Sequence, residues 1–487
     1  MAEPPSSDRP TGVSFVEIDP LARELGERFR VAGFELHLVG GVVRDALMGR
    51  VREDADIDLT TSAKPMDSVR VLQGWADQRY VQGARFGTVG ARKDGRRFEI
   101  TTFREEMYPG DDRRPAVTFG KDLRTDLSRR DFTFNAMAVS LPDGAFEDPF
   151  GGVRDLAAKL LDTPLEPDIA FSDDPLRMLR AARFVSVLGV TPSDRVVAAI
   201  AGMRSRLAIV SRERIQTELN RLLLGAEPGR GLQLLVDTGL AEEFLPELPS
   251  LALEQDPVHK HKDVLRHTYA VVEGCDASDL TLRLAALFHD VGKPRTREYT
   301  PEGVQFHHHE VVGARMAESR LRELRYPTAV IDDVRTLIEM HLRFHGYGDG
   351  WSDAAVRRYV RDAGPLLDRL NQLTRADVTT ANLFKAKQFR ALQDDLEERI
   401  ARLAEEENLD AMRPALDGNE IMEHLGLAPG PLVGEAWKHL MEIRLERGPV
   451  PREEALRLLD EWAASKGIAV PGDGSPGSGD AGNPSER

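Results

Sequence analysis

The stretch over residues 39–61, VGGVVRDALMGRVREDADIDLTT, constrains the fold more than any other part of the sequence. The apolar run FELHLVG just before the glycines is typical of a strand, and Arg44 follows where a helix would begin. In DADIDLTT, Asp56 and Asp58 are two residues apart, so a strand turns both carboxylates to one face. Ile57 and Leu59 then point to the opposite face, into a core. We therefore expect a glycine turn beside two paired acids.

This combination predicts a site for phosphate and a divalent cation. Gly40 and Gly41 let backbone amides approach an anion closely, and a following helix N-terminus favours phosphate. Two adjacent carboxylates repel unless a cation lies between them, and Mg²⁺ prefers such oxygen ligands. The pattern suits two-metal nucleotidyl transfer. Glu99 in RRFEITTF is either a third carboxylate of the site or a surface strand position, and Arg104 is a candidate contact to triphosphate.

The length and charge of the chain set further limits. The 487 residues are too many for one core and indicate three or more domains. The net charge of −16 means that nucleic-acid binding requires a local basic surface. Cys275 is the single cysteine, which excludes a disulfide framework and favours a reducing cytoplasm. We expect neither a signal peptide nor a membrane span, because no long apolar run is present.

The chain changes character along its length. Short strand-like runs alternate with helices up to about residue 160, and helical periodicity dominates afterwards. The prolines of LPELPSLALEQDP mark a boundary near residue 250. We expect disordered tails at 1–12 and 467–487, an α/β head at 13–160, a helical neck at 161–250, a histidine-rich domain at 251–380 and a helical C-terminal region at 381–466.

A basic segment lies within this acidic chain. Residues 177–221 contain nine arginines and no lysine against three acids, which gives a local charge of +6. Such a surface can bind an RNA backbone and would read shape and end, not base sequence.

Five motifs in order resemble a known family. The glycine and aspartate motifs are followed by LSRRDFTFNAMAV (127–139), EDPFGGVRDLAAKLL (147–161), SDDPLRMLRAARF (172–184) and SRERIQTELNRLL (211–223). Together they resemble the DNA polymerase β superfamily, and more narrowly the bacterial CCA-adding tRNA nucleotidyltransferases and their poly(A) polymerase relatives. The resemblance implies a multidomain α+β fold, with a polymerase-β-like head of mixed sheet and helices followed by an all-α neck, a helical domain of the HD type and a helical C-terminal region.

The resemblance also assigns roles to residues. Asp174 and Arg177 correspond to the pair that reads the base of C or A, although this chain has Asp173 where the family usually has glutamate. Asp56 and Asp58 would hold Mg²⁺ as catalytic residues, with Glu99 as a third candidate. The remaining nucleotide-binding candidates are Gly40, Gly41, Arg44, Asp45, Arg104, Arg130, Asp131, Asn135, Arg180 and Arg183.

The implied reaction is template-independent addition of C, C and A to the 3′ end of tRNA from CTP and ATP, with no obligate protein partner. The motifs are shared with poly(A) polymerases and with enzymes that add only CC or only A, so these alternatives stay open. An alternative of another class is an HD nucleotide phosphohydrolase or sensor with a regulatory head.

The histidine-rich block carries a second resemblance. His267, the adjacent His289 and Asp290, and Asp377 follow the order found in the HD phosphohydrolase superfamily, which binds a divalent transition metal. Three interpretations stay open for this block: hydrolysis of 2′,3′-cyclic or 2′-phosphates at RNA ends, a metal-holding domain without turnover, or a purely structural domain. Further candidate ligands are His307, His308, His309 and His341.

Overall fold

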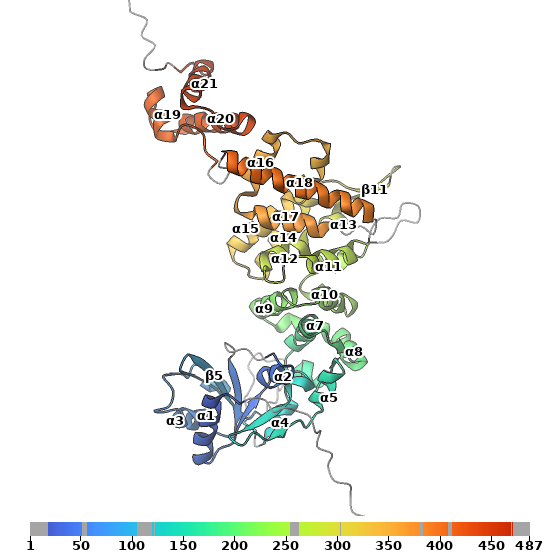
Figure 1. Ribbon diagram of the computed structural model, residues 1–487. Helices are drawn as coiled ribbons and strands as arrows, with labels where there is room; N and C mark the ends of the chain where they lie inside the picture. Colours follow the sequence, from blue (N-terminus) through green and yellow to red (C-terminus); the bar gives the residue numbers. More distant parts are fainter. Residues whose placement is uncertain are drawn as a thin grey trace, which may run out of the picture.

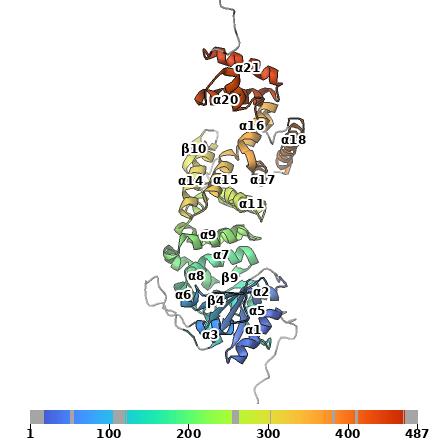
Figure 2. The same cartoon turned by 90° about the vertical axis from the view of Figure 1, so that its left-hand side faces the viewer.

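The computed structural model describes residues 18–50, 56–104, 119–120, 122–253, 263–301, 303–378, 383–407, 412–468 and 470. The molecule is elongated, with the sheet-containing head at one end, helices stacked along the middle and a small helical unit at the other end (Figures 1 and 2). The predicted tail at 1–12 and most of that at 467–487 lie outside the described residues. Ile468 and Val470 pack against the last helical unit, so this unit extends beyond the predicted limit at 466.

The head is built on a mixed sheet of seven strands, as predicted. The strand order is β3-β4-β5-β2-β1-β6-β7, and β2 and β5 are parallel while the other neighbours are antiparallel. Alternate residues such as Leu38, Leu59 and Phe98 form its core. The strands are β1 (Leu36–Val39), β2 (Ile57–Thr61), β3 (Gln78–Tyr80), β4 (Thr88–Lys93), β5 (Arg96–Thr102), β6 (Ala138–Leu141) and β7 (Phe146–Glu147).

Short helices cover this sheet. The helix that begins at Pro65 ends at Val71, and Gly74 beyond it takes a positive φ of 74° that a helix does not allow. The head helices are α1 (Pro20–Val31), α2 (Gly41–Leu47), α3 (Pro65–Val71), α4 (Leu123–Ser128) and α5 (Gly152–Ala157).

The neck is helical, as the periodicity predicts. Ser211 caps α9 by accepting a hydrogen bond from the backbone amide of Arg214. The neck elements are β8 (Leu160–Leu161), α6 (Pro167–Asp173), α7 (Leu176–Leu188), β9 (Thr191–Pro192), α8 (Asp194–Met203), α9 (Arg212–Leu223) and α10 (Pro228–Asp237).

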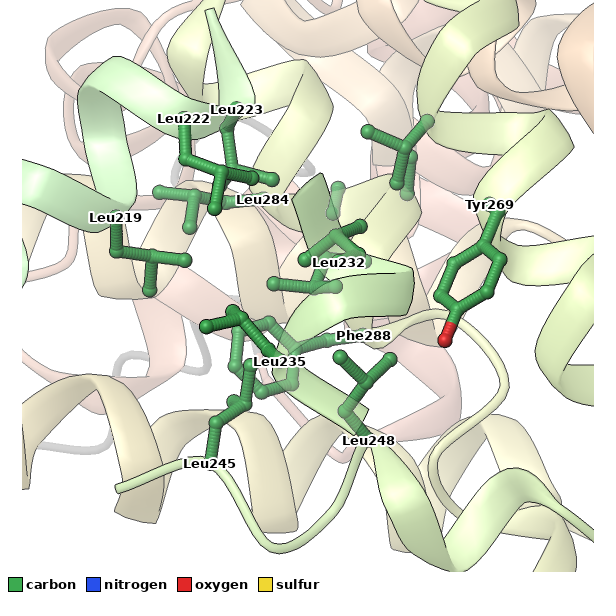
Figure 3. Close-up of a cluster of buried hydrophobic side chains, with 14 of the residues drawn as sticks. Leu219, Leu222, Leu223, Leu232, Leu235, Leu245, Leu248, Tyr269, Leu284 and Phe288 are labelled. Atoms are coloured by element: carbon green, nitrogen blue, oxygen red, sulfur yellow. The ribbon is translucent and has the colours of Figure 1, made fainter. Parts of the chain in front are cut away.

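The histidine-rich block packs directly on the neck. One continuous core joins them, in which leucines of α9 and α10 meet Leu284 and Phe288 of α12 (Figure 3). The predicted boundary near residue 250 is therefore not a break in packing. The elements of this block are α11 (Val264–Gly274), α12 (Leu280–Phe288), α13 (Lys293–Thr296), β10 (Arg297–Thr300), β11 (Gly303–Phe306), α14 (His309–Glu323), α15 (Thr328–Met340), α16 (Asp353–Ala363) and α17 (Leu367–Asp377).

The C-terminal helices divide between two cores. Leu396 and Leu403 of α18 (Leu383–Glu407) join the core shared by the neck and the histidine-rich block. The other three helices form a separate core, and they are α19 (Gly418–Leu425), α20 (Pro431–Arg447) and α21 (Arg452–Ser465). Glu407 links the two parts, since it accepts hydrogen bonds from Arg357 on α16 and Arg444 on α20. Among the described helices, none has the length and apolar character needed to cross a lipid bilayer.

Candidate active site in the head and a histidine–aspartate cluster

Three carboxylates gather at two interior strands of the head sheet, β2 and β5. Asp58 on β2 lies directly opposite Glu99 on the parallel strand β5, and Asp56 precedes β2 by one residue. Burial raises the pKa of Asp58 to about 6, and the negative charges of Glu99 and Asp56 act in the same direction, against Arg130. Asp56 also lies 3.5 Å from Arg97. This excess of negative charge on hard oxygen donors fits a Mg²⁺ site.

The glycine turn leaves space beside these acids. Gly40 has a φ of 72°, and a Cβ atom there would lie 2.9 Å from Arg130 Nη1 and 3.9 Å from Asp58 Oδ2. Any side chain would therefore be strained and would push Arg130 away. Gly41 is the first residue of α2, so this helix begins three residues before Arg44, where the sequence predicts its start.

A chain of polar contacts joins the head to the neck. Arg44, which also bonds Asp45, donates through Nη1 to Asn135 Oδ1 at 2.8 Å. Asn135 in turn donates to Asp131 at 2.9 Å, and Arg180 Nε on α7 donates to the other Asp131 oxygen at 2.9 Å. Although burial opposes ionisation, Arg180 and the Asn135 hydrogen bond hold the pKa of Asp131 well below its usual range. The arginine-lined helix α7 thus reaches the head.

Arg183 has a different environment from the one expected. Its side chain is buried, with the guanidinium 4.0 Å from the Phe184 ring centroid and 3.1 Å from Glu218 Oε2. Burial and the charge of Arg180 lower the pKa of Arg183 to about 10. It therefore lies behind Arg180 instead of lining an open nucleotide pocket. Glu218 was not singled out from the sequence, although an acid on the apolar face of α9 is a signal of buried pairing.

The pair expected to read the base is arranged differently as well. Asp174 lies between α6 and α7, where its Oδ2 accepts a hydrogen bond from Arg214 Nη2 at 2.7 Å. Arg177 turns away and donates to the backbone carbonyls of Ala170 and Arg129. The donor beside Asp174 is therefore Arg214 of α9, 40 positions later in the chain. No local spacing could have indicated this pairing.

A buried acid supports the edge of the site. Asp126 on α4 accepts hydrogen bonds from Thr60 Oγ1 at 3.1 Å and from the backbone amide of Arg104 at 3.2 Å, and it lies 3.6 Å from Arg130. Arg104 itself donates to Thr88 at 2.8 Å. Asp126 was not predicted from the sequence; it lies on α4, and Arg130 lies two residues beyond the end of that helix.

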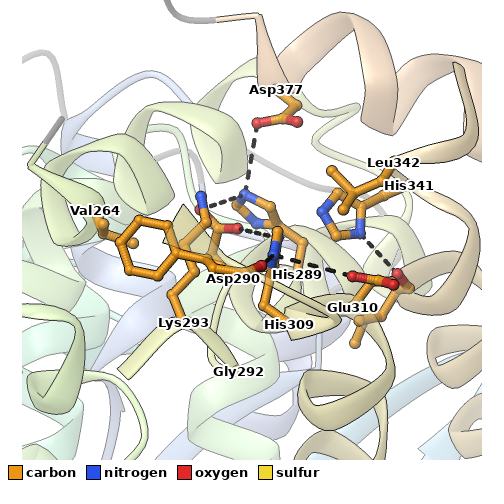
Figure 4. A network of polar contacts seen from close by, with 12 residues as sticks. Val264, His289, Asp290, Gly292, Lys293, His309, Glu310, His341, Leu342 and Asp377 are labelled. Carbon is orange, nitrogen blue, oxygen red and sulfur yellow. Dashed lines mark hydrogen bonds and ion pairs between the residues drawn. The ribbon is translucent and has the colours of Figure 1, made fainter. Parts of the chain in front are cut away.

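The histidine-rich block brings six candidate ligands together. They come from α11, from α14, from the segment after α12, and from the C-terminal ends of α15 and α17 (Figure 4). His267, His289 and Asp290 form one group, and Asp290, His309 and His341 form another, with the ligand atoms of each group within 4.8 Å of one another. Asp377 closes the first group, with Oδ1 2.8 Å from His267 Nε2.

The orientation of the imidazoles fits metal binding. The Nδ1 atoms of three histidines donate to backbone carbonyls at 2.7–2.8 Å, which turns each Nε2 atom inward; these are His289, His309 and His341. Among the described residues, Nε2 of His309 and of His341 is buried without a hydrogen-bond partner. Burial, together with the neighbouring His289, lowers the pKa of His341 to about 3, so this ring is neutral. Lys293 Nζ lies 2.7 Å from Asp290.

Two further histidines do not join this cluster. His307 Nε2 contacts Gln305 Oε1 at 2.5 Å, and the side chain of His308 is 84% exposed. Of the HHH run, only His309 enters the cluster, because it begins α14 and faces Asp290.

Comparisons with known proteins agree with this architecture. Three families match in order: "Poly A polymerase head domain" over residues 36–162, "Probable RNA and SrmB- binding site of polymerase A" over 189–251, and "HD domain" over 263–412. The chain is 34% identical to the A-adding tRNA nucleotidyltransferase of Deinococcus radiodurans, covering 88% of this chain and 95% of that protein. It is 33% identical to the CC-adding tRNA nucleotidyltransferase of Thermus thermophilus, covering 88% and 94%.

A solved structure shows the same arrangement. The CCA-adding enzyme of Bacillus stearothermophilus in complex with CTP superposes with a TM-score of 0.67 at 25% identity, covering 92% of this chain and 99% of that one. The acid-bearing mixed sheet joined to an arginine-rich helical neck is that of a nucleotidyltransferase. The chain belongs to the tRNA nucleotidyltransferase family.

Proposed function

We propose that this protein adds C, C and A to the 3′ end of tRNA, using CTP and ATP and releasing pyrophosphate. The observation that carries this proposal is the placement of Asp58 and Glu99 side by side, next to Arg130 and the glycine turn. Neighbouring acids and guanidinium groups provide both the ligands for a metal ion and the donors for phosphate oxygens that a nucleoside-triphosphate site needs. The proposed site works within a reducing cytoplasm and needs no membrane or obligate protein partner.

The residues divide the work by their chemistry. Asp56 and Asp58 would hold Mg²⁺, which when bound activates a hydroxyl and neutralises a departing pyrophosphate. Arg130 and Arg44 donate hydrogen bonds to phosphate oxygens while the 3′-hydroxyl forms its bond to the α-phosphorus. Asp174 accepts a hydrogen bond from the amino group that C and A both carry and U lacks.

The number of nucleotides added is tested directly. Purified protein, tRNA lacking CCA, CTP and ATP are incubated together, and the 3′ ends are sequenced. We expect complete CCA ends from both nucleotides and C additions alone from CTP. Relatives matched over most of their length are named A-adding and CC-adding. Ends that stop at CC would indicate a CC-adding enzyme instead. Addition of A only to ends that already carry CC would indicate an A-adding enzyme. Long A tails without C would indicate a poly(A) polymerase.

A second activity is proposed for the histidine–aspartate cluster. The two ligand groups that share Asp290 favour a binuclear transition-metal centre, and Lys293 beside them can bind a phosphate. We propose that this domain, residues 251–380 in our division of the chain, hydrolyses 2′,3′-cyclic or 2′-phosphates at RNA ends.

This second proposal has its own assay. Hydrolysis of 2′,3′-cyclic AMP is measured with Mn²⁺, Ni²⁺ or Co²⁺ added, together with metal content by mass spectrometry. Bound metal without hydrolysis would leave a metal-holding domain, and neither metal nor hydrolysis would leave a structural one. His308→Ala is the matched control, because this exposed histidine lies beside the cluster without entering it.

A further inference from the structure

A basic depression lies on the side of α9 that faces α14, outside the nucleotide site. Its volume is about 720 Å³, and four arginines and two glutamates contribute most of its lining: Arg212, Arg315, Arg322, Arg325, Glu318 and Glu323. Two of the arginines are already paired, Arg212 with Glu323 at 3.0 Å and Arg322 with Glu318 at 2.8 Å. The net charge of the lining is +2, so the depression attracts an anion.

The other two arginines have no acidic partner. Within the part of the chain that the structure describes, the side chains of Arg315 and Arg325 make no hydrogen bond or ion pair, and both residues are exposed. Arg315, Arg322 and Glu318 recur at three- and four-residue spacing, so they lie on one polar face of α14, on which both arginines are exposed. Unpaired guanidinium groups in a concave site are suited to bidentate binding of phosphate.

The backbone at Arg325 points to a role for its side chain. Arg325 follows the end of α14 with a φ of 65°, the left-handed conformation that glycine normally provides after a helix. Gln216 of α9 donates a hydrogen bond to its carbonyl oxygen at 3.3 Å and holds the turn in place. A residue other than glycine is strained at this position, and this strain points to a use for the arginine side chain.

Helix α9 connects the depression to the nucleotide site. Arg212 and Arg214 are two positions apart, so they project roughly 200° apart around the helix. Arg214 contacts Asp174 on one side, while Arg212 lines the depression on the other. The two sites are thus separated by about one helix diameter, ~10 Å. A single strand with its 3′ end at Asp174 can reach the depression within a few nucleotides.

We propose that this depression binds a backbone phosphate of the RNA substrate just upstream of the growing 3′ end. The proposal rests on the proposed tRNA function, and its ligand is a phosphodiester, not a free nucleotide. Bound there, the phosphate would hold the strand in register while its end is extended.

The test uses the full chain and the double variant Arg315→Ala/Arg325→Ala. We expect the Kd for tRNA lacking CCA to rise about tenfold, with the slope of log Kd against log salt smaller by about one, because the contact to one phosphate is lost. The KM for CTP should stay unchanged. Arg335→Ala on α15 is the matched control, since among the described residues that partly exposed arginine pairs with Glu339 on its own helix.

Several outcomes would overturn the proposal. A Kd and salt slope equal to those of the unmodified protein would do so, and a raised KM for CTP with unchanged tRNA binding would indicate a free-nucleotide phosphate site instead. Arg325→Gly separates binding from folding: it should weaken tRNA binding without lowering the melting temperature, because glycine relaxes the backbone. Since Kd is measured without turnover, this test stands even if the unmodified protein adds no nucleotide, a result that would reject only the proposed function.

Discussion

The acidic site of the head and the histidine–aspartate cluster of the histidine-rich block, called the body below, both suit a cation. Their own charges are balanced in opposite ways. In the head, Asp56 and Glu99 are exposed, and the raised pKa of Asp58 shows that its negative charge is poorly compensated. In the body, Asp290 is buried, yet the charges of His289 and Lys293 hold its pKa far below the usual range. The negative charge of the head site is therefore not neutralised until a cation binds. The negative charge of Asp290 in the body is already neutralised by neighbouring residues.

The difference has a structural origin. The head acids lie at the interior strands β2 and β5, and because Asp56 and Glu99 are exposed there, a nucleotide could carry Mg²⁺ in and take it away. The body ligands project from five places on helices that share one core, so their positions are fixed by packing before any ligand binds. An exchangeable ion that enters with substrate fits the head, and a resident ion fits the body.

The largest expected effect tests whether the head site and the body site have separate roles. Asp58→Asn should lower nucleotide incorporation by ~10³-fold or more, because a Mg²⁺ ligand at the reacting phosphate is lost. The metal content of the body should not change. His289→Ala should do the reverse, removing the bound transition metal and leaving incorporation intact. Both are measured by incorporation of labelled CTP and by metal analysis of the same preparations.

A matched control accompanies this exchange of variants. Asp67→Asn removes a carboxylate of the head whose ion pair among the described residues is with exposed Arg70, so it should alter neither property. If His289→Ala abolished incorporation while Asp58→Asn preserved it, the two roles would have to be exchanged.

Removal of metal should lower the melting temperature through the site in the body and not through the site in the head. Dialysis against a chelator should lower the melting temperature of the unmodified protein by several degrees, because a resident ion stabilises only the folded state. The shift should persist in Asp58→Asn and vanish in His341→Ala, which lacks an inward-facing ligand. Differential scanning calorimetry with and without chelator measures both, and an equal shift in the two variants would contradict a resident ion in the body.

Arg214 is expected to have a smaller effect, on nucleotide choice. Its bond to Asp174 orients the carboxylate that would accept the amino group of C or A. Arg214→Gln keeps a hydrogen-bond donor but removes the charge, so we expect the KM for CTP and ATP to rise about tenfold with kcat nearly unchanged. Steady-state kinetics with each nucleotide check this. A loss confined to kcat would mean that Arg214 does not act on base binding.

The head and its acids were predictable from sequence because their signals are local. The alternation in DADIDLTT predicts β2, with Asp58 turned away from the core formed by Ile57 and Leu59, as the structure has it. The ends of the predicted strands and helices differ by a few residues, since glycines such as Gly74 stop helices where the apolar pattern continues.

The partners of the neck arginines were not predictable, because they depend on how α7 and α9 pack. The three-residue spacing of Arg177, Arg180 and Arg183 suggests one shared face. Packing gives each a different partner: backbone carbonyls for the first, Asp131 for the second and Glu218 for the third. The spacing of residues in the sequence predicts on which side of a helix they lie. It does not predict which residues of the neighbouring helix contact them.

The smallest expected effect is on the pH dependence of the free energy of unfolding, through the contact between Asp131 of the head and Arg180 of the neck. Because the pKa of Asp131 lies well below its unfolded value of about 3.9, its contact with Arg180 stabilises the fold above that pH. This contribution is lost as the pH falls toward the lower folded pKa. Asp131→Asn should therefore reduce the free energy of unfolding at pH 7 by about 2 kcal/mol, with Glu218 still neutralising Arg180. Urea unfolding of both proteins between pH 7 and pH 2.5 measures the difference, which should shrink below about pH 4. A difference that stayed constant across this range would show that Asp131 acts through packing and not through its charge.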